Sequence, residues 1–210
     1  VEFAWGGGLY RRRGGVVPVV VYMDAYLASM RTTETQTFAM WWYQYKRLVW
    51  DKLVGLRDVR FVDRFLPCSP YIGDVYKRYG FPEGRFTVLP NIVPNTAPPR
   101  AARDENELTV LYVGRLVHVK GVDLAVDALS RLKEFSFKLL IIGDGEMRRD
   151  IEQSIARSGI HAEMPGWVPE KEVGRYYEAA DIFVHPARWP DPAPRTIVGA
   201  LQHGLPVVVP

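Results

Sequence analysis

Residues 108–145 read LTVLYVGRLVHVKGVDLAVDALSRLKEFSFKLLIIGDG, and this stretch decides the fold class. It opens with an apolar, β-branched run at 108–113, which predicts a buried strand. A helix is expected over 121–135, because apolar residues recur there at helical spacing, at Val122, Leu124, Ala125, Ala128, Leu129 and Leu132. A second apolar run at 137–142 predicts the next strand. Strand, helix and strand in this order indicate a parallel sheet.

The same alternation continues to the end of the chain. Helices are expected over 146–157, 171–179 and 196–202, with strands within 162–168 and over 182–185 and 205–209. This rhythm predicts an α/β, doubly wound parallel sheet. Ligands of such sheets bind at the carboxyl ends of the strands.

Residues 1–107 are less regular. Strands are expected over 16–22, 61–69 and 86–89, and helices over 34–56 and 72–79. Residues 92–106 are rich in Pro, Ala and charge and have no apolar period, which is typical of an interdomain linker.

Composition limits the function classes. The 210 residues are 48% hydrophobic and 24% charged, which allows one or two domains with a sizeable core. The sequence contains no apolar run of about 18 residues, so no membrane-spanning helix is expected. The lone cysteine, Cys68, excludes an internal disulfide and a Cys-based zinc site, and we expect it to be a buried small residue in a cytoplasmic protein. The absence of an initial Met suggests a fragment of a longer chain.

Charge is unevenly distributed. Residues 1–100 contain 14 Lys and Arg against eight Asp and Glu. This excess would suit phosphates, anionic lipid or nucleic acid, or it is simply a solubilising surface. The aromatic helix expected over 34–56 would pack on a core, lie on a membrane surface or stack on nucleic-acid bases. We favour packing on a core. No nucleic-acid-binding motif is present to support base stacking.

Glycines and basic residues gather at the expected strand ends. Gly114 and Arg115 follow one strand, Lys120 precedes the next helix, and Gly143 and Gly145 follow the second strand. Glycine allows a ligand to approach the backbone, while the two cations and a helix N-terminus suit a diphosphate. The pattern is not GxGxxG, so a nicotinamide or flavin dinucleotide is poorly supported.

Four segments, VGRLVHVKGVDLAVDAL, LLIIGDGEMRRDIE, GWVPEKEVGRYYEAADIFVHPA and GALQHGLPVVVP, resemble in order and spacing the C-terminal domain of family 4 (group 1) retaining glycosyltransferases. The resemblance implies GT-B architecture, with two Rossmann-like domains that are both incomplete in this chain. Residues 1–92 would be the latter part of an acceptor-side domain, 93–107 the linker, and 108–210 a truncated donor domain.

The resemblance also implies roles for individual residues. Arg115 and Lys120 would hold the donor diphosphate beside Gly114, Gly143 and Gly145, while Trp167 and Val168 would receive the nucleobase. Two family glutamates, which contact the donor sugar and the ribose, correspond here to Asp191 and Gly199. Losing the ribose contact would weaken the binding free energy of the donor by about 1–3 kcal/mol. Pro194 offers no N–H to phosphate, although Arg195 and Thr196 could supply theirs. Asp24 would act in catalysis, in orienting the acceptor or contacting the donor sugar, or else it caps a turn.

We therefore expect an enzyme that transfers a sugar from a nucleoside diphosphate donor to a carbohydrate or lipid-linked acceptor hydroxyl with retention, in polysaccharide or glycolipid biosynthesis. No metal or cofactor is expected, and contact with the inner membrane face would be peripheral. The alternatives are a non-catalytic nucleotide-sugar binder and a GT-B-like nucleotide-sugar epimerase. His118, His161 and His203 are expected at the surface or in packing, and His185 in either a structural or a functional role.

Overall fold

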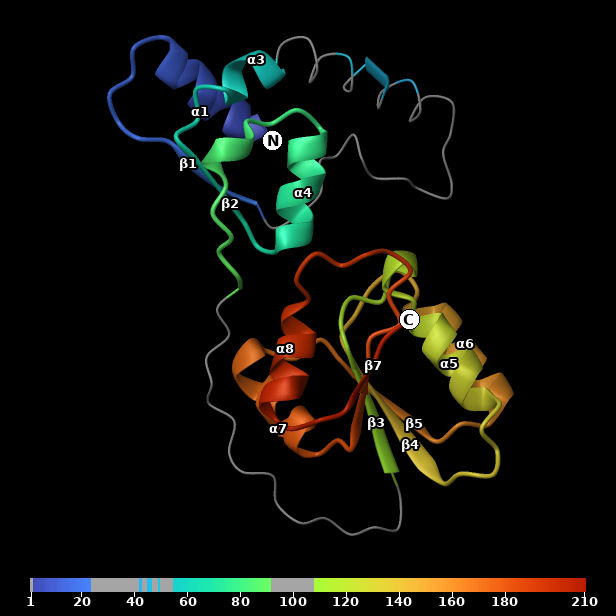
Figure 1. Cartoon of the computed structure of the whole chain (residues 1–210). Coiled ribbons are helices and arrows are strands. Elements are labelled where there is room, and N and C mark those ends of the chain that lie inside the picture. Colours follow the sequence, from blue (N-terminus) through green and yellow to red (C-terminus); the bar gives the residue numbers. More distant parts are fainter. Residues whose placement is uncertain (1, 24–41, 43–44, 47–48, 50–54, 92–107) are drawn as a thin grey trace. The chain divides into compact units, whose positions relative to one another are not determined.

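The computed structural model describes residues 2–23, 42, 45–46, 49, 55–91 and 108–210. The chain divides into two compact units, Val1–Asn91 and Ile92–Pro210, which are described separately (Figure 1). Most of the helix expected over 34–56, the expected linker and Asp24 lie outside the described residues.

The second unit is built around a five-stranded parallel sheet in the order β5-β4-β3-β6-β7. The strands are β3 (Leu108–Val113), β4 (Phe137–Ile142), β5 (Ala162–Gly166), β6 (Ile182–Val184) and β7 (Val207–Val208). The helices between them are α5 (Val122–Ser130), α6 (Arg148–Ser158), α7 (Glu170–Glu178) and α8 (Arg195–Gln202), with a 3-10 turn η4 (His118–Lys120) before α5. The predicted doubly wound α/β sheet is confirmed.

Alternate residues of the central strands form two cores. Val110 and Tyr112 of β3 pack in one buried cluster with residues of α5 and α6. Leu111 lies in the other cluster, together with Tyr177 of α7 and Ala200 of α8. Because successive strand residues point to opposite faces, a continuous apolar run supplies both cores. Figure 1 shows α5 and α6 on one side of the sheet and α7 and α8 on the other.

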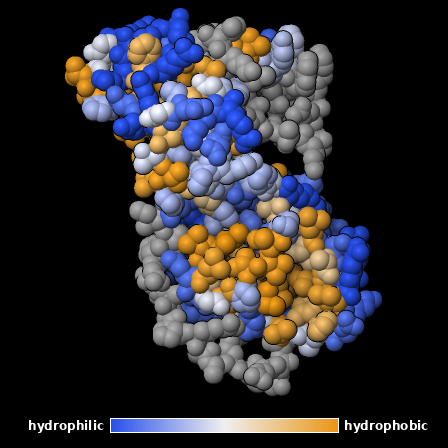
Figure 2. All heavy atoms as spheres, in the orientation of Figure 1, coloured by the Kyte–Doolittle hydropathy of each residue, from blue (hydrophilic) through white to orange (hydrophobic). Residues whose placement is uncertain are grey.

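Helix α5 differs from the expected simple apolar face. The helix ends at Ser130, earlier than the expected residue 135; Val122, Ala125 and Val126 are buried, but Leu124 and Leu132, which follows the helix, are each 42% exposed. These two leucines line an open groove of about 580 Å³, which we call the apolar groove; it also includes Phe135, Val208 and Val209. Figure 2 shows apolar side chains gathered in a patch on this unit.

The first unit contains a two-stranded parallel sheet, β1 (Val20–Met23) with β2 (Arg64–Pro67). Its helices are α1 (Glu2–Arg12), α3 (Leu56–Val59) and α4 (Pro70–Arg78), with a 3-10 turn η3 (Glu83–Arg85). Ser69 caps α4 by accepting a hydrogen bond from the Ile72 N–H. Cys68 is buried, as predicted.

Two predictions for the first unit need correction, and one helix was not predicted. The strand expected over 16–22 begins only at Val20, after Pro18, and Val16 is 85% exposed. The strand expected over 86–89 is reduced to a single bridge between Phe86 and Phe65. Helix α1 was not predicted, because it contains three consecutive glycines, Gly6 to Gly8. No helix among the described residues is both long and apolar enough to cross a membrane.

Candidate donor site at the carboxyl end of the second sheet

Glycines let three loops approach one another at the carboxyl end of this sheet. Gly143, after β4, has φ +138°, and a Cβ there would lie 1.9 Å from the Gly114 carbonyl oxygen. Gly121, at the start of α5, has φ +67°, and its Cβ would lie 1.9 Å from the Pro186 carbonyl oxygen. A Cβ on Gly145 would lie 2.4 Å from the Leu116 carbonyl oxygen. These positions therefore require glycine for loop packing, whether or not a ligand is bound.

Lys120 and Asp191 are brought together from two of these loops. The Lys120 ammonium donates a short hydrogen bond to Asp191 Oδ2, and both side chains are largely buried. His185 Nε2 lies 3.5 Å from the same carboxylate oxygen, and Lys120 also lies over the Trp189 ring, 5.9 Å from its centre. Lys120, His185, Trp189 and Asp191 thus form one cluster at the strand ends.

The environment keeps Asp191 ionised. Burial raises the pKa of this carboxyl, but the neighbouring His185 and the hydrogen bond and charge of Lys120 outweigh burial and leave the pKa below its usual range. The cluster therefore contains a fixed carboxylate beside a fixed ammonium.

Arg188 joins the loop after β6 to the start of α5. Its guanidinium donates two hydrogen bonds to the Asp123 carboxylate, at 2.7 and 2.6 Å, and a third to the His118 carbonyl at 2.9 Å. The Arg188 backbone N–H donates to the Val119 carbonyl at 3.0 Å. Two hydrogen bonds therefore hold the turn that ends in Lys120, and two more join the same arginine to the first turn of α5. The side-chain hydrogen bond from Arg188 is the largest cause that lowers the pKa of Asp123.

Arg115 is an exposed cation at this edge. Its carbonyl accepts a hydrogen bond from the Tyr112 hydroxyl at 2.9 Å, which fixes the backbone. Within the described residues its guanidinium has no hydrogen bond or ion pair. Lys120 is already paired with Asp191, so Arg115 contributes the uncompensated positive charge.

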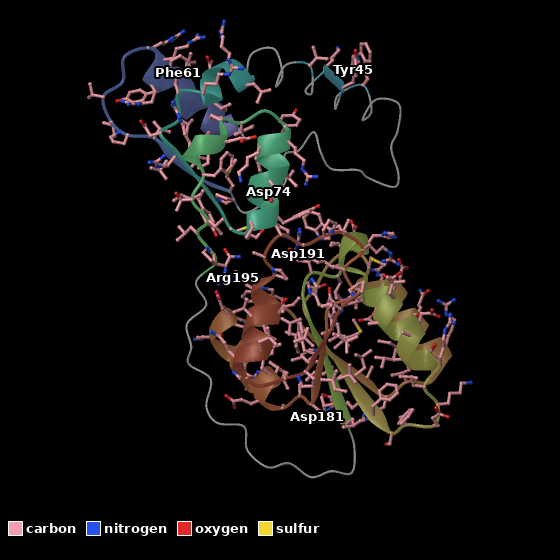
Figure 3. The ribbon with its side chains drawn as sticks, in the orientation of Figure 1. Tyr45, Phe61, Asp74, Asp181, Asp191 and Arg195 are labelled. Atoms are coloured by element: carbon pink, nitrogen blue, oxygen red, sulfur yellow. The ribbon has the colours of Figure 1, made fainter. Side chains whose placement is uncertain are left out.

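The remaining predicted donor residues lie around the same end of the sheet. Trp167, after β5, is 73% exposed, and Val168 beside it packs partly on the core. Arg195 begins α8 and forms an exposed ion pair with Glu170. The Thr196 carbonyl accepts a hydrogen bond from the Tyr177 hydroxyl at 3.1 Å, while the first N–H groups of the helix have no partner inside it. Figure 3 shows Asp191 and Arg195 at one end of the sheet and Asp181 at the other.

Gly199 faces a protein side chain. A Cβ at this buried position would lie 3.1 Å from two ring carbons and the hydroxyl oxygen of Tyr177. That ring also stacks on His203, at 5.1 Å between centres. A carboxylate-bearing side chain at Gly199 would require the Tyr177 ring to shift.

Sequence reasoning missed two features of this edge. Arg188 lies outside the four quoted segments, and Asp123 lies within the first of them but was given no role; the only signal was their proximity in sequence to Asp191 and Lys120. His185 is buried beside Asp191, whereas His118 and His161 lie at the surface and His203 packs on Tyr177, as expected. In the part of the chain that the structure describes, no three His, Cys, Asp or Glu residues are placed to hold a metal ion.

The family model for glycosyl transferases group 1 matches residues 95–210, more than half of the chain. The chain belongs to the group 1 glycosyltransferases. This group 1 chain is 32% identical over 110 residues to the amylovoran biosynthesis glycosyltransferase AmsK of Erwinia amylovora, covering 48% of the chain and 27% of that protein. It is 28% identical over 157 residues to the putative colanic acid biosynthesis glycosyltransferase WcaL of Escherichia coli, covering 70% and 39%.

Solved structures show the same fold. The crystal structure of Anabaena HepE in complex with UDP matches 98% of this group 1 chain and 56% of that protein, with a TM-score of 0.79 and 18% identity. Sucrose-phosphate synthase from Thermosynechococcus elongatus matches 96% and 52%, with a TM-score of 0.76 and 20% identity. The α/β fold is thus that of GT-B glycosyltransferases, and the chain spans about half the length of these structures and less of the curated relatives.

Proposed function

We propose that this chain contributes the donor site of a retaining, family 4 glycosyltransferase that transfers a sugar from a nucleoside diphosphate to an acceptor hydroxyl. The observation that carries the proposal is the pairing of Lys120 with Asp191 beside the exposed Arg115, at the end of the sheet where ligands of this fold bind. UDP in the HepE structure, at the level of fold, supports a nucleotide ligand.

Positive charge at this edge suits the chemistry. As the bond to the sugar breaks, negative charge accumulates on the departing diphosphate. Arg115, Lys120 and the N-terminus of α5 would stabilise that charge, and Lys120 and the helix are held in position before the reaction. The bidentate pair with Arg188 offsets the Asp123 carboxylate in the first turn of α5, so this carboxylate does not cancel the positive field.

The carboxylate of Asp191 has a separate proposed role. It takes the place of the family glutamate that contacts the donor sugar, and its low pKa keeps it an acceptor for sugar hydroxyls. We further propose that residues 108–210 form the donor domain, that 1–92 belong to the acceptor side, and that Asp24 serves there. The relatives in amylovoran and colanic acid biosynthesis support a carbohydrate or lipid-linked acceptor in polysaccharide synthesis.

Gly199 supports a second candidate, a nucleotide-sugar binder without transferase activity. Tyr177 fills the space beside Gly199, so no carboxylate is available there for the ribose. Such a protein would retain diphosphate binding through Arg115 and Lys120 and would lose the precise placement of the sugar.

A product analysis on the natural full-length protein separates the two candidates. It would be incubated with UDP-glucose and candidate saccharide acceptors, and UDP release and the anomeric configuration of the product would be followed by NMR. Formation of an α-linked product from the α-configured donor supports the retaining transferase. UDP binding without product across acceptors supports the binder, and a β-linked product contradicts retention.

A further inference from the structure

The first unit has a basic pocket at the amino ends of its strands. It has a volume of about 770 Å³ and is lined by Arg11, Gly14, Gly15, Val16, Phe61, Asp63, Arg64 and Arg85. Arg64 is the first residue of β2, Val16 precedes β1, and Arg85 ends η3 just before the bridge at Phe86. Ligands of parallel α/β sheets bind at the carboxyl ends of strands, so this pocket lies at the opposite edge from the expected substrate edge of its own sheet.

The single carboxylate of the pocket is already neutralised. Asp63 is contacted by two nitrogens of Arg11, each at 3.1 Å, and accepts a hydrogen bond from the Val19 N–H at 2.8 Å. The Val19 hydrogen bond is the largest influence on the pKa of Asp63 and lowers it, and nearby Arg11 and Arg85 lower it further. Asp63 and Arg11 therefore form a closed pair that leaves other cations in excess.

Arg64 and Arg85 supply that excess charge. Neither has a carboxylate partner within the described part of the chain. Arg85 Nη1 donates to the carbonyls of Arg60 and Val62, at 2.5 and 2.6 Å, and Arg64 Nη1 contacts the Gly84 carbonyl at 3.4 Å. One nitrogen of each guanidinium is thus anchored to backbone while the others stay available. An anchored group loses less conformational entropy when it binds an anion.

The edge of the pocket is apolar. Val16 is 85% exposed and Phe61 is 43% exposed; Figure 3 labels Phe61 on the first unit. Gly14, with φ +92°, has no side chain to obstruct entry. The volume falls within the range of about 300–1,000 Å³ typical of small-molecule sites, and it exceeds what a bare phosphate needs. Anchored arginines beside an exposed ring suit a phosphate group that is joined to a larger body.

We propose that this pocket is a second binding site, distinct from the donor site, for a phosphate-bearing ligand that contacts Arg64 and Arg85 and rests against Phe61. A sugar phosphate and a phospholipid headgroup share this chemistry. The first unit is where we propose the acceptor side to lie, but the pocket stands on its own contacts and does not require transferase activity.

Calorimetric titration of the natural full-length protein tests the site. Saturating UDP or the Lys120→Met substitution removes competing binding at the donor site. Glucose 1-phosphate is expected to bind and glucose is not. Arg64→Gln should weaken binding about 5- to 50-fold, since one charge-assisted contact is lost at a half-open site, and Arg64→Lys should recover part of it. Arg64 is exposed at a strand start, so these variants should remain folded.

Arg78→Gln is the matched control, because Arg78 is an exposed arginine of the same unit outside the pocket. It should leave the affinity unchanged. Vesicles containing phosphatidylglycerol distinguish the ligand source: vesicle binding that Arg64→Gln weakens, when glucose 1-phosphate does not bind, identifies a lipid headgroup. The proposal is overturned if neither probe binds at up to about 10 mM phosphate groups, or if Arg64→Gln and Arg78→Gln weaken binding equally.

Discussion

Arg188 and Asp123 form a bidentate ion pair that connects the loop after β6 to the first turn of α5, across 65 residues of sequence. Both side chains are partly exposed, so we expect a moderate coupling energy of about 1 kcal/mol from a double-mutant cycle of Arg188→Ala and Asp123→Ala. Urea unfolding of the four proteins measures it. A coupling energy near zero would show that the pair does not hold these loops.

The same pair predicts a pH dependence. The Arg188 hydrogen bond lowers the pKa of Asp123 in the folded protein below the ordinary value of 3.8 for an aspartate. The stabilisation is therefore complete above that value and is lost as the pH falls through the lower folded-state pKa. The stability difference between the wild type and Arg188→Ala should be constant from about pH 8 to pH 5 and shrink below about pH 4. A difference that grows on acidification would contradict this assignment.

Lys120 should contribute strongly to UDP binding. Lys120→Met removes a charge-assisted contact and should raise the Kd for UDP about 10- to 100-fold. Lys133→Met is the control, because Lys133 is an exposed lysine in the turn between α5 and β4. Calorimetry measures both, with circular dichroism to confirm folding. If the two substitutions changed the Kd for UDP equally, Lys120 would make no specific contact with the nucleotide.

Gly143 should tolerate no side chain. Gly143→Ala places a Cβ against the Gly114 carbonyl and forces an unfavourable φ, so it should destabilise the protein by about 3 kcal/mol or more. Gly159→Ala, at φ +72° with open space around it, should cost only about 1 kcal/mol. Chemical unfolding measures the free energy of unfolding of both variants. The difference between the two values gives the cost of the steric clash between the Cβ and the Gly114 carbonyl. If both variants lost a similar amount of unfolding free energy, the loops at Gly143 and Gly114 could move apart at little energetic cost.

Local patterns predicted the second unit well and the first unit less well. The apolar runs of β3 and β4 occur at the predicted residues, since strands buried on both faces leave an unmistakable signature. Helix α1 could not be predicted, because its glycines favour no helix. It is held by tertiary packing, and Gly8 lies so close to α3 that a Cβ would be 2.0 Å from the Asp58 carbonyl oxygen.

The candidate donor site rests on residues that the sequence proposes one by one, and their contacts come from the structure alone. Lys120 and Asp191 were both expected near the donor, yet they are 71 residues apart and nothing local indicates that they touch. Arg188 lies in an irregular, proline-rich loop, where no periodicity shows the direction of a side chain. Gly199 was interpreted as the loss of a carboxylate, whereas the structure adds that Tyr177 occupies the adjoining space.

The apolar groove has a practical consequence for every unfolding measurement on this chain. Dyes that fluoresce on contact with apolar surfaces would bind at Leu124, Leu132 and Phe135 while the protein is still native. Their signal would begin high and rise little on heating, which would make a well-folded sample resemble a partly molten one. Circular dichroism reports the backbone instead, and it is the detection method on which comparisons between variants should rest.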